Sequence, residues 1–213
     1  MNAIDVKNIS MRYGAVQALS NVSVGFEPEK IYGLLGRNGA GKTTLIHLIT
    51  NKLFPTQGEI TIEGHQVAEN DRALSRVFAM TEQNLIPEGM RIKQAMEWAK
   101  EFYEQFDDVY ALSLAQKFGL DPNKKAKQLS TGYASIIKLI LTLASGAPIL
   151  IFDEPVLGLD APHRELFYRE LLALFAKRPC TVILSTHLID EAAQVIEQAV
   201  ILASAPSVRP RRG

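Results

Sequence analysis

Gly36-Arg37-Asn38-Gly39-Ala40-Gly41-Lys42-Thr43 decides the fold expected for this chain of 213 residues. The stretch fits the pattern G-x-x-x-x-G-K-[ST], in which the backbone N–H groups of a glycine-rich loop surround phosphate oxygens. The apolar run 31–35 precedes it as an expected strand, and residues 44–50 follow it with apolar side chains at helical spacing. Strand, loop and helix in this order predict a P-loop. The alternative is an ordinary glycine turn before a helix, which the restrictive eight-residue pattern and its matching flanks disfavour.

This loop supplies most of the residues that we expect to hold a nucleotide. Lys42 is expected to reach the β- and γ-phosphates, and the Thr43 hydroxyl to bind Mg²⁺. The partial positive charge at the N-terminus of the following helix favours the same phosphates. The predicted phosphate-binding residues are Gly36, Arg37, Asn38, Gly39, Ala40, Gly41, Lys42, Thr43 and Thr44.

The charge of the chain is balanced, with 23 Lys and Arg against 23 Asp and Glu. This balance argues against a dedicated nucleic-acid binder, whose affinity rests on a basic surface. Residues 1–7 begin an alternating strand and lack the basic and long apolar regions of a signal peptide. The longest apolar stretch, 136–152, contains Lys138, Gly146 and Pro148, so we expect a buried helix followed by a strand and not a membrane span.

The single cysteine, Cys180, cannot form an internal disulfide. It directly precedes the apolar run 181–184, which is typical of a buried strand. We therefore expect a buried, inert thiol in a reducing compartment.

The periodicity of apolar residues changes twice along the chain. It is typical of strands at first, becomes helical from about Pro87 to Ser145, and then alternates between strands and helices. Helices that alternate with apolar strands predict an α/β fold, with a mainly parallel sheet covered by helices on both faces. The expected strands are 4–9, 22–26, 31–35, 59–63, 76–80, 148–152, 181–185 and 199–202, and the expected helices, after 44–50, are 93–106, 109–118, one beginning near Ser130, 163–176 and 188–196.

The C-terminal residues 203–213 differ in composition from the rest. They contain two prolines, three arginines and one sizeable apolar residue. This composition predicts a disordered basic tail. Contact of the tail with anionic lipid or nucleic acid is the alternative.

Two acids, Asp153 and Glu154, end the apolar run 147–152. A P-loop enzyme needs an acid at such a position to hold the Mg²⁺ shell, and we assign this role to Asp153. Glu154, one residue further on, is placed to orient or deprotonate an attacking water. The alternative is a pair of exposed acids at a strand end, which the P-loop upstream in the same chain disfavours.

Five further segments complete a family pattern in the same order. They are Met11–Gly14 with Tyr13, Thr81–Asn84 with Gln83, Leu129–Tyr133 at the start of a helix, Gly158–Asp160, and Ser185–His187 at a strand end. Together with the P-loop and the acid pair, they make the chain similar to the nucleotide-binding subunits of ABC transporters over nearly its whole length.

The resemblance implies ATP and Mg²⁺ as cofactors and gives three residues a role beside them. Tyr13 would stack on adenine, Gln83 would contact the metal or the attacking water, and His187 would bond the γ-phosphate and align the water. Taken singly, each residue also has an ordinary role. Tyr13 would be a packing aromatic, Gln83 a solvated side chain and His187 a hydrogen-bonded histidine at a sheet edge.

A second group of residues is implied to serve another subunit. Ser130 and Gly132 open a helix whose N-terminus can bind an anion, and the resemblance implies that they complete the ATP site of a partner, with Asp160 nearby. The ordinary alternatives are an N-cap for Ser130 and a turn or cap residue for Asp160. Dimerisation is thereby expected to be part of catalysis.

The resemblance also implies the organisation and surroundings of the protein. We expect one ATP-binding domain over 1–202, with a P-loop NTPase core, an N-terminal antiparallel β part and a helical subdomain inserted at about 84–146. The expected partners are a transmembrane permease subunit and a second ATP-binding subunit, without nucleic acid, and the expected location is cytoplasmic, at the inner face of the membrane. Five side chains of the insertion would either receive the membrane partner or form the subdomain core: Met90, Met96, Trp98, Phe102 and Tyr103.

Two departures from the family pattern indicate a divergent branch. Thr131 and Tyr133 give Ser-Thr-Gly-Tyr in place of the usual Ser-Gly-Gly-Gln, and Val156 and Leu157 replace a small polar pair. These changes bear on the signature contacts more than on ATP hydrolysis.

Two other classes of P-loop protein remain as alternatives. A soluble ABC ATPase acting on ribosomes or DNA would be favoured by paired nucleotide-binding halves or a long heptad insertion. A small-molecule P-loop kinase would not need the segments 130–133 and 185–187.

Overall fold

A parallel sheet with helices on both faces forms the centre of the molecule. The computed structural model describes residues 1–83 and 86–203; Asn84 and the tail from 204 onward lie outside the described residues. The sheet has the strand order β6-β7-β8-β3-β9, and each neighbouring pair is parallel. Its strands are β3 (Ile31–Leu35), β6 (Val77–Met80), β7 (Ile149–Asp153), β8 (Thr181–Ser185) and β9 (Gln198–Ile201).

Side chains of the central strands alternate between two hydrophobic cores. On β7, Leu150 and Phe152 pack into one core, whereas Ile149 and Ile151 pack into the other. Successive side chains of a strand point to opposite faces, so a strand with both faces covered is mainly apolar. All five residues of β7 and of β8 are buried accordingly.

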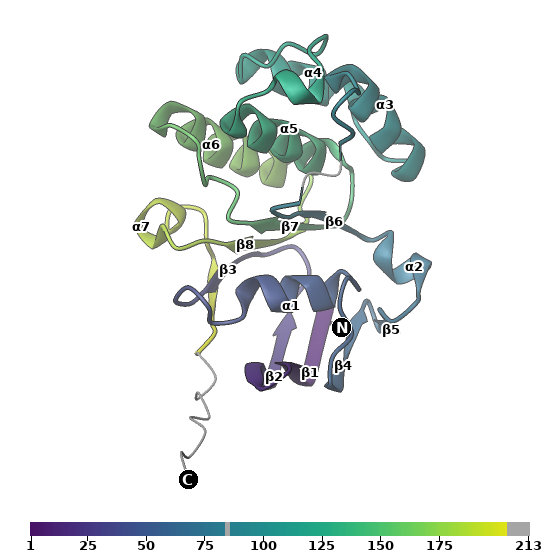
Figure 1. Ribbon diagram of the computed structural model, residues 1–213, viewed down its shortest axis with the longest axis vertical. Helices are drawn as coiled ribbons and strands as arrows, with labels where there is room; N and C mark the ends of the chain where they lie inside the picture. The colour runs from purple at the N-terminus through teal and green to yellow at the C-terminus, as the bar shows by residue number, and fades with distance from the viewer. Residues whose placement is uncertain (84–85, 204–213) are drawn as a thin grey trace.

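Helices cover one face of the sheet, and a second sheet lies beyond the other face (Figure 1). On the first side are α5 (Thr131–Ala144) and α6 (Ala161–Lys177), and on the second is α1 (Lys42–Ile49). Beyond α1 lies an antiparallel sheet of order β2-β1-β4-β5. Its strands are β1 (Ile4–Tyr13), β2 (Val16–Phe26), β4 (Gln57–Ile62) and β5 (His65–Gln66).

A helical insertion separates β6 from β7 in the chain. It contains α3 (Ile92–Phe102), α4 (Asp108–Lys117), the 3₁₀ turn Ala126–Gln128 and α5. The side chain of Asp107 caps α4 by accepting a hydrogen bond from the N–H of Tyr110 at 2.8 Å. Together with the short α2 (Asp71–Leu74) and α7 (Ile189–Ala192), these elements confirm the expected α/β fold with an antiparallel part and inserted helices.

The five large side chains of the insertion divide between core and surface. Met96 is buried, and the Tyr103 hydroxyl donates a hydrogen bond to the Val77 carbonyl at 2.9 Å, so both belong to the packed interior. Trp98 and Phe102 are 52% and 75% exposed on α3. Met90 is partly buried in the turn before this helix.

Several element boundaries differ from the expected ones. The helix expected over 93–106 ends at Phe102, because Tyr103 is extended and its ring packs at 4.7 Å from that of Phe78. Only Ile189–Ala192 of the helix expected over 188–196 is helical. The first two strands are longer than expected, because they pair with each other along nearly their whole length. Neither the short α2 nor β5 was expected.

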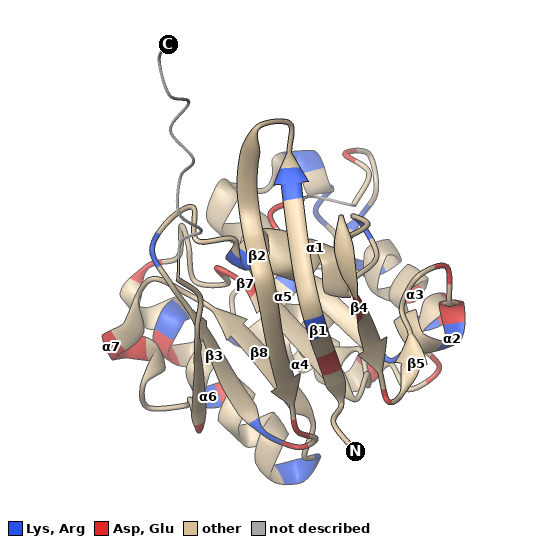
Figure 2. Ribbon diagram, turned by 90° about the horizontal axis from the view of Figure 1, so that it is seen from below, with Lys and Arg blue, Asp and Glu red and all other residues tan. Residues whose placement is uncertain are grey.

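The thiol of Cys180 is buried, as expected. Burial raises its pKa to about 11, which keeps it protonated and unreactive at neutral pH. Acidic and basic residues are interspersed on the side of the molecule that Figure 2 shows. Within the described part of the chain, no helix combines the length and the apolar character that crossing a membrane would need.

Candidate functional site

The P-loop connects the end of β3 to the start of α1 and packs against β2. Gly41 has φ +96, in the left-handed region that favours glycine. A Cβ at this position would lie 2.5 Å from Cδ2 of Leu19 and 2.8 Å from the carbonyl oxygen of Ala18. Gly41 therefore lets β2 approach the loop closely. It is also the N-cap of α1 and provides no side-chain cap, so the first N–H groups of the helix are left for a bound anion.

Lys42, the first residue of α1, is 7% exposed. Its ammonium group donates a hydrogen bond to the Gly36 carbonyl at 2.9 Å, which folds the side chain back along the loop. The same Nζ lies 3.9 Å from Oε1 of Glu154. Lys42 thus connects the loop to the acid pair at the end of β7.

Asp153 is the last residue of β7 and is 6% exposed. Burial raises the pKa of its carboxyl group, and the hydroxyls of Thr43 and Ser185 offset this in part. Among the described residues, its Oδ1 has no hydrogen-bond partner. A buried carboxylate oxygen without a partner, beside the Thr43 hydroxyl, is the donor set that Mg²⁺ prefers, so these residues fit the metal implied for a P-loop.

Glu154 follows directly and turns the chain sharply. Its φ of +48 is unusual for a residue with a side chain, and such strain concentrates at functional sites. Its N–H donates to the Ser185 carbonyl at 2.9 Å. Its Oε2 lies 2.8 Å from Nδ1 of His187, so Lys42 and His187 contact one carboxylate oxygen each. The ends of β7 and β8 and the P-loop meet at this carboxylate.

Replacing Asp153 by asparagine should stabilise the protein when divalent cations and nucleotide are removed. The folded-state pKa of Asp153 lies above its ordinary value of 3.8, so the ionised form costs folding free energy, and this cost grows as pH rises through the folded pKa. Asn keeps the shape without the charge. We expect the Tm of Asp153→Asn to exceed that of the wild type by a few degrees at neutral pH, with the difference shrinking towards about pH 4.

Thermal unfolding of both proteins in EDTA across this pH range measures the effect. The same substitution at the exposed Asp121 serves as the control. An Asp153→Asn variant less stable than the wild type at neutral pH would contradict the burial argument.

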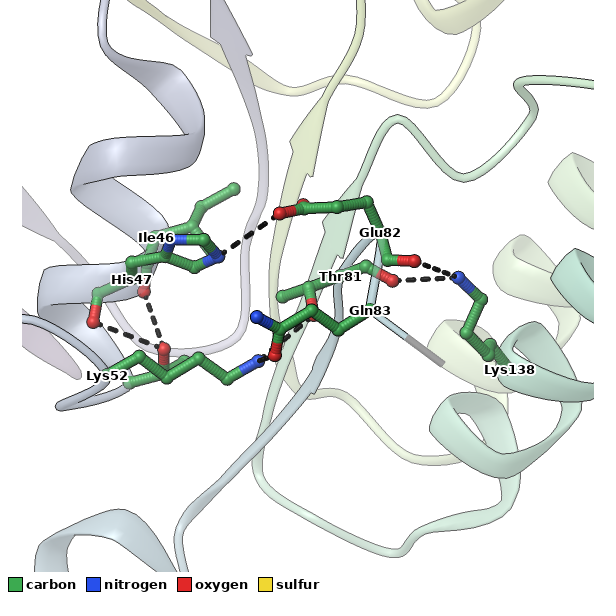
Figure 3. Close-up of polar contacts among 8 residues, drawn as sticks. Ile46, His47, Lys52, Thr81, Glu82, Gln83 and Lys138 are labelled. Carbon is green, nitrogen blue, oxygen red and sulfur yellow. Dashed lines mark hydrogen bonds and ion pairs between the residues drawn. The ribbon is translucent and has the colours of Figure 1, made fainter. Parts of the chain in front are cut away.

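The segment Thr81–Gln83 after β6 presents its side chains in different directions (Figure 3). The Gln83 amide oxygen accepts a hydrogen bond from Lys52 at 3.4 Å. The Glu82 carboxylate points towards α1, where its Oε1 lies 3.7 Å from Nε2 of His47. The negative charge of Glu82 also raises the pKa of Asp153. The side chain of this segment that points towards α1 is therefore Glu82.

Glu82 was missed by the sequence reasoning, which selected Gln83 by residue type. The sequence did indicate this residue by its position, because Glu82 lies two residues after Met80, the last residue of β6. The structure places Gln83 beside Lys52, and its contact with metal or water stays a prediction.

Tyr13 ends β1 and is 47% exposed, with Val16 of β2 as its partner across the turn. Its ring is therefore accessible at an end of the antiparallel sheet, which is compatible with stacking on a base. Its contact with adenine stays a prediction.

The predicted signature segment lies at the exposed start of α5. Ser130 is the N-cap and accepts a hydrogen bond from the N–H of Tyr133 at 3.4 Å. A Cβ on Gly132 would lie 3.1 Å from the Gly158 carbonyl oxygen, so this glycine permits close packing against the turn before α6. Asp160 caps α6 by accepting from the N–H of His163 at 3.0 Å.

The substituted signature residue Tyr133 packs beside the same cap. Its ring lies edge-on to that of His163 at 6.2 Å, and the Nδ1 of this histidine lies 2.7 Å from Oδ1 of Asp160. Over residues 1–83 and 86–203, no hydrogen bond or ion pair joins Ser130 or Asp160 to Lys42, Asp153, Glu154 or His187. The site residues therefore form two groups: one at the P-loop and one at the starts of α5 and α6.

Comparison with solved structures shows the same fold. An ATP-binding subunit of an ABC transporter superposes with a TM-score of 0.85 at 24% identity, over 95% of this chain and 86% of that one. A dimeric ATP-binding cassette in a post-hydrolysis state, bound to ADP and phosphate, superposes with a TM-score of 0.82 at 23% identity, over 94% of each chain. These likenesses confirm the expected P-loop NTPase architecture.

Sequence comparison adds relatives above this level of identity. The taurine import ATP-binding protein TauB of Jannaschia sp. is 32% identical over 97% of this chain and 80% of its own. The Nod factor export ATP-binding protein I of Rhizobium etli is 31% identical over the whole chain and 69% of its own. YtrB, an ABC transporter ATP-binding protein of Bacillus subtilis, is 29% identical over 88% of this chain, which spans 64% of the length of YtrB.

The sequence profile of the ABC transporter family matches residues 19–157, from β2 through the P-loop and the signature helix to the acid pair. This range holds Lys42, Ser130, Asp153 and Glu154. The chain therefore belongs to the ABC transporter family as one of its ATP-binding proteins, and it is an ATPase.

Proposed function

We propose that this chain is the Mg²⁺-dependent motor subunit of a transporter, which drives a separate membrane subunit through ATP-dependent head-to-tail dimerisation. The observation that carries the proposal is the Glu154 carboxylate between Lys42 and His187, beside the buried acid Asp153. A general base next to a phosphate-binding lysine is what hydrolysis of a nucleotide requires.

Each residue at this site has a role that follows from its position. The N–H groups of the P-loop and the Lys42 ammonium bind and orient the phosphates of ATP. Thr43 and Asp153 would hold Mg²⁺, which supplies charge compensation on the phosphates. Glu154 accepts the proton of the attacking water once one of its oxygens exchanges a present contact for that water. His187, already 2.8 Å from this carboxylate, fixes its orientation.

The second group of residues supports a shared site. Ser130 and Gly132 at the start of α5 and Asp160 at the start of α6 support a site shared with a partner. Both helix N-termini are exposed, and among the described residues no hydrogen bond or ion pair joins Ser130 or Asp160 to the P-loop group. A helix N-terminus attracts anions through its free N–H groups and its dipole. In a head-to-tail dimer, this end of α5 would face the γ-phosphate held by the other subunit.

We propose that the chain forms a single domain over residues 1–202, with the helical subdomain inserted at about 84–146. The membrane partner docks on this helical insertion. The exposed Trp98 and Phe102 on α3 support this placement. Large apolar side chains exposed together mark interaction surfaces. The protein would then lie at the cytoplasmic face of the membrane, held there by its partner. Relatives named for import and for export both match, so the direction of transport stays open.

Co-purification tests this function against the alternative of an ABC ATPase that acts on ribosomes or DNA. The tagged protein should be recovered from detergent-solubilised membranes in a complex with a hydrophobic subunit. The double variant Trp98→Ser, Phe102→Ser should reduce this recovery by about tenfold, because two exposed apolar anchors are lost. The matched control is the same change at Leu172, which is exposed on α6. Recovery with ribosomes or DNA only would contradict the transporter assignment.

A further inference from the structure

A cavity of about 670 Å³ lies at the amino ends of the parallel strands, opposite to the nucleotide-binding residues. Its lining residues include Arg76, Ile149 and Thr181, which precede or begin β6, β7 and β8. Asp153, at the other end of β7, lies four residues beyond Ile149, which corresponds to about 13 Å along the strand. Small-molecule sites have volumes of roughly 300–1,000 Å³. The cavity is therefore large enough for a small molecule and separate from the nucleotide site.

Two basic side chains line one end of this cavity. They are Arg72 on α2 and His65 on β5, and within residues 1–83 and 86–203 neither side chain forms a hydrogen bond or an ion pair. The neighbouring Arg76 is different, because its guanidinium donates two hydrogen bonds to the Glu63 carboxylate, at 2.9 and 3.0 Å. The charge of Arg76 is thereby compensated, whereas the Arg72 guanidinium is left for a ligand.

The backbone of Glu63 is held in an unusual conformation at this end of the cavity. Glu63 has φ +48 and Gly64 has φ +80, at the two-residue turn between β4 and β5. Such a turn favours Asn or Gly at its first position, so a glutamate there is unfavourable for the backbone alone. Its carboxylate instead attaches the hairpin, and His65 with it, to Arg76 at the start of β6. The basic end of the cavity is therefore held by a fixed wall.

The rest of the cavity is apolar up to its far end, where one carboxylate lies. The charge of Glu29, which precedes β3, raises the pKa of Cys180, so this carboxylate is close to the start of β8. Three strand spacings separate β6 from β3, which corresponds to about 14 Å. An anion at the Arg72 end would therefore be largely screened from Glu29 at physiological salt. The apolar lining residues include Ile62, Pro148, Ile149 and Pro179.

We propose that this cavity binds a small organic anion with an apolar body. The carboxylate or phosphate group of the ligand accepts hydrogen bonds from Arg72, with His65 beside it, and the body lies against Ile62 and Ile149. A guanidinium presents its donors in a planar fork that matches either anionic group. The site goes beyond the proposed function and does not depend on ATP.

NMR titration of the full-length, isotope-labelled protein tests the site with three probes: octanoate, hexyl phosphate and inorganic phosphate. Octanoate or hexyl phosphate should cause saturable shifts of the backbone amide signals of residues 63–65, 72–76 and 180–181. The one that binds more tightly identifies the anionic group. Inorganic phosphate should bind there at least about tenfold more weakly, because it has no apolar body to bury. Signals of residues 36–43 report separately on binding at the P-loop.

Three variants isolate the contribution of Arg72. Arg72→Gln should raise the Kd of the tighter probe at the cavity by at least about tenfold, as loss of a hydrogen bond to a charged group predicts. Arg72→Lys keeps the charge without the fork, and its Kd should lie between the two. The matched control is Arg169→Gln, an exposed position on α6 outside the cavity, which should bind as the wild type does.

A comparison of ligands in the wild type keeps the test independent of any variant that does not fold. Octanol has the apolar body of octanoate without its charge, so it should bind at the cavity at least about tenfold more weakly than octanoate.

The outcomes separate this proposal from the proposed function. Equal affinity of the wild type and Arg72→Gln, or of octanoate and octanol, overturns the anion site, and so does the absence of saturable shifts with octanoate and hexyl phosphate. Inorganic phosphate that binds as tightly as both overturns the apolar body. Weaker binding by Arg72→Gln alone, with Arg169→Gln unchanged, supports the site. Activity of the Lys42 and Glu154 variants tests the proposed function separately.

Discussion

Replacing Lys42 by alanine is expected to abolish ATP hydrolysis and to weaken ATP binding by about 10² to 10⁴-fold. The Lys42 ammonium is positioned by the Gly36 carbonyl at 2.9 Å and is nearly buried, so little entropy is lost when it meets a phosphate. Each hydrogen bond between charged groups contributes roughly 1.5–3 kcal/mol, and two such bonds to the β- and γ-phosphates account for the expected range. Fluorescent-nucleotide titration and steady-state ATPase assays measure the two effects.

The same substitution also changes the surroundings of Glu154. Without Lys42, His187 is the one neighbour among residues 1–83 and 86–203 with which the carboxylate forms an ion pair. The control is Lys7→Ala, which removes an exposed ion pair with Glu59 on the antiparallel sheet and should leave activity unchanged. Wild-type ATPase activity in a folded Lys42→Ala protein would remove the P-loop from the mechanism.

Much of the core could be predicted from sequence because short-range patterns specify it. The boundaries of β3 and β8 agree with the predicted 31–35 and 181–185, since both strands are short, mainly apolar and almost completely buried. The P-loop could be recognised because its characteristic residues are adjacent in the sequence. Gly41, whose backbone is in the left-handed region, directly precedes Lys42 at the start of α1. Helix ends such as that of α3 were placed less well, because long-range packing of Tyr103 terminates the helix.

The segment Thr81–Gln83 could not be predicted, for a physical reason. The directions of its side chains depend on Lys52 and Lys138, which lie 29 and 57 residues from Thr81. No local pattern encodes such pairings. Resemblance selected Gln83 by residue type, and its proposed contact stays a prediction, whereas the direction of the Glu82 carboxylate, towards His47 on α1, required the structure.

The meeting of Glu154 and His187 was likewise only implied. The two residues are 33 positions apart, and they meet because β7 and β8 are adjacent parallel strands whose carboxyl ends lie at the same edge of the sheet. Sequence reasoning could place each residue at a strand end. The strand order, which brings the two ends together, required the structure.

Glu154→Gln is expected to lower kcat by about 10² to 10⁴-fold while leaving ATP binding intact, as loss of a general base predicts. Gln keeps the size of the side chain and can still accept a hydrogen bond from His187, so the strained turn at φ +48 persists. It also removes a negative charge beside the phosphates, which favours the bound state. With hydrolysis blocked, ATP should hold two subunits together, and light scattering with saturating ATP and Mg²⁺ should give the mass of a dimer.

The matched control is Glu165→Gln, which removes an exposed carboxylate on α6 and should hydrolyse ATP at the wild-type rate. A Glu154→Gln protein that binds ATP yet remains monomeric would contradict the shared site. One that hydrolyses ATP normally would contradict the general base. The two readouts report on different groups: turnover depends on the carboxylate between Lys42 and His187, and association on the exposed start of α5 at Ser130. In the proposed dimer, ATP would join the P-loop of one chain to the exposed signature helix of another.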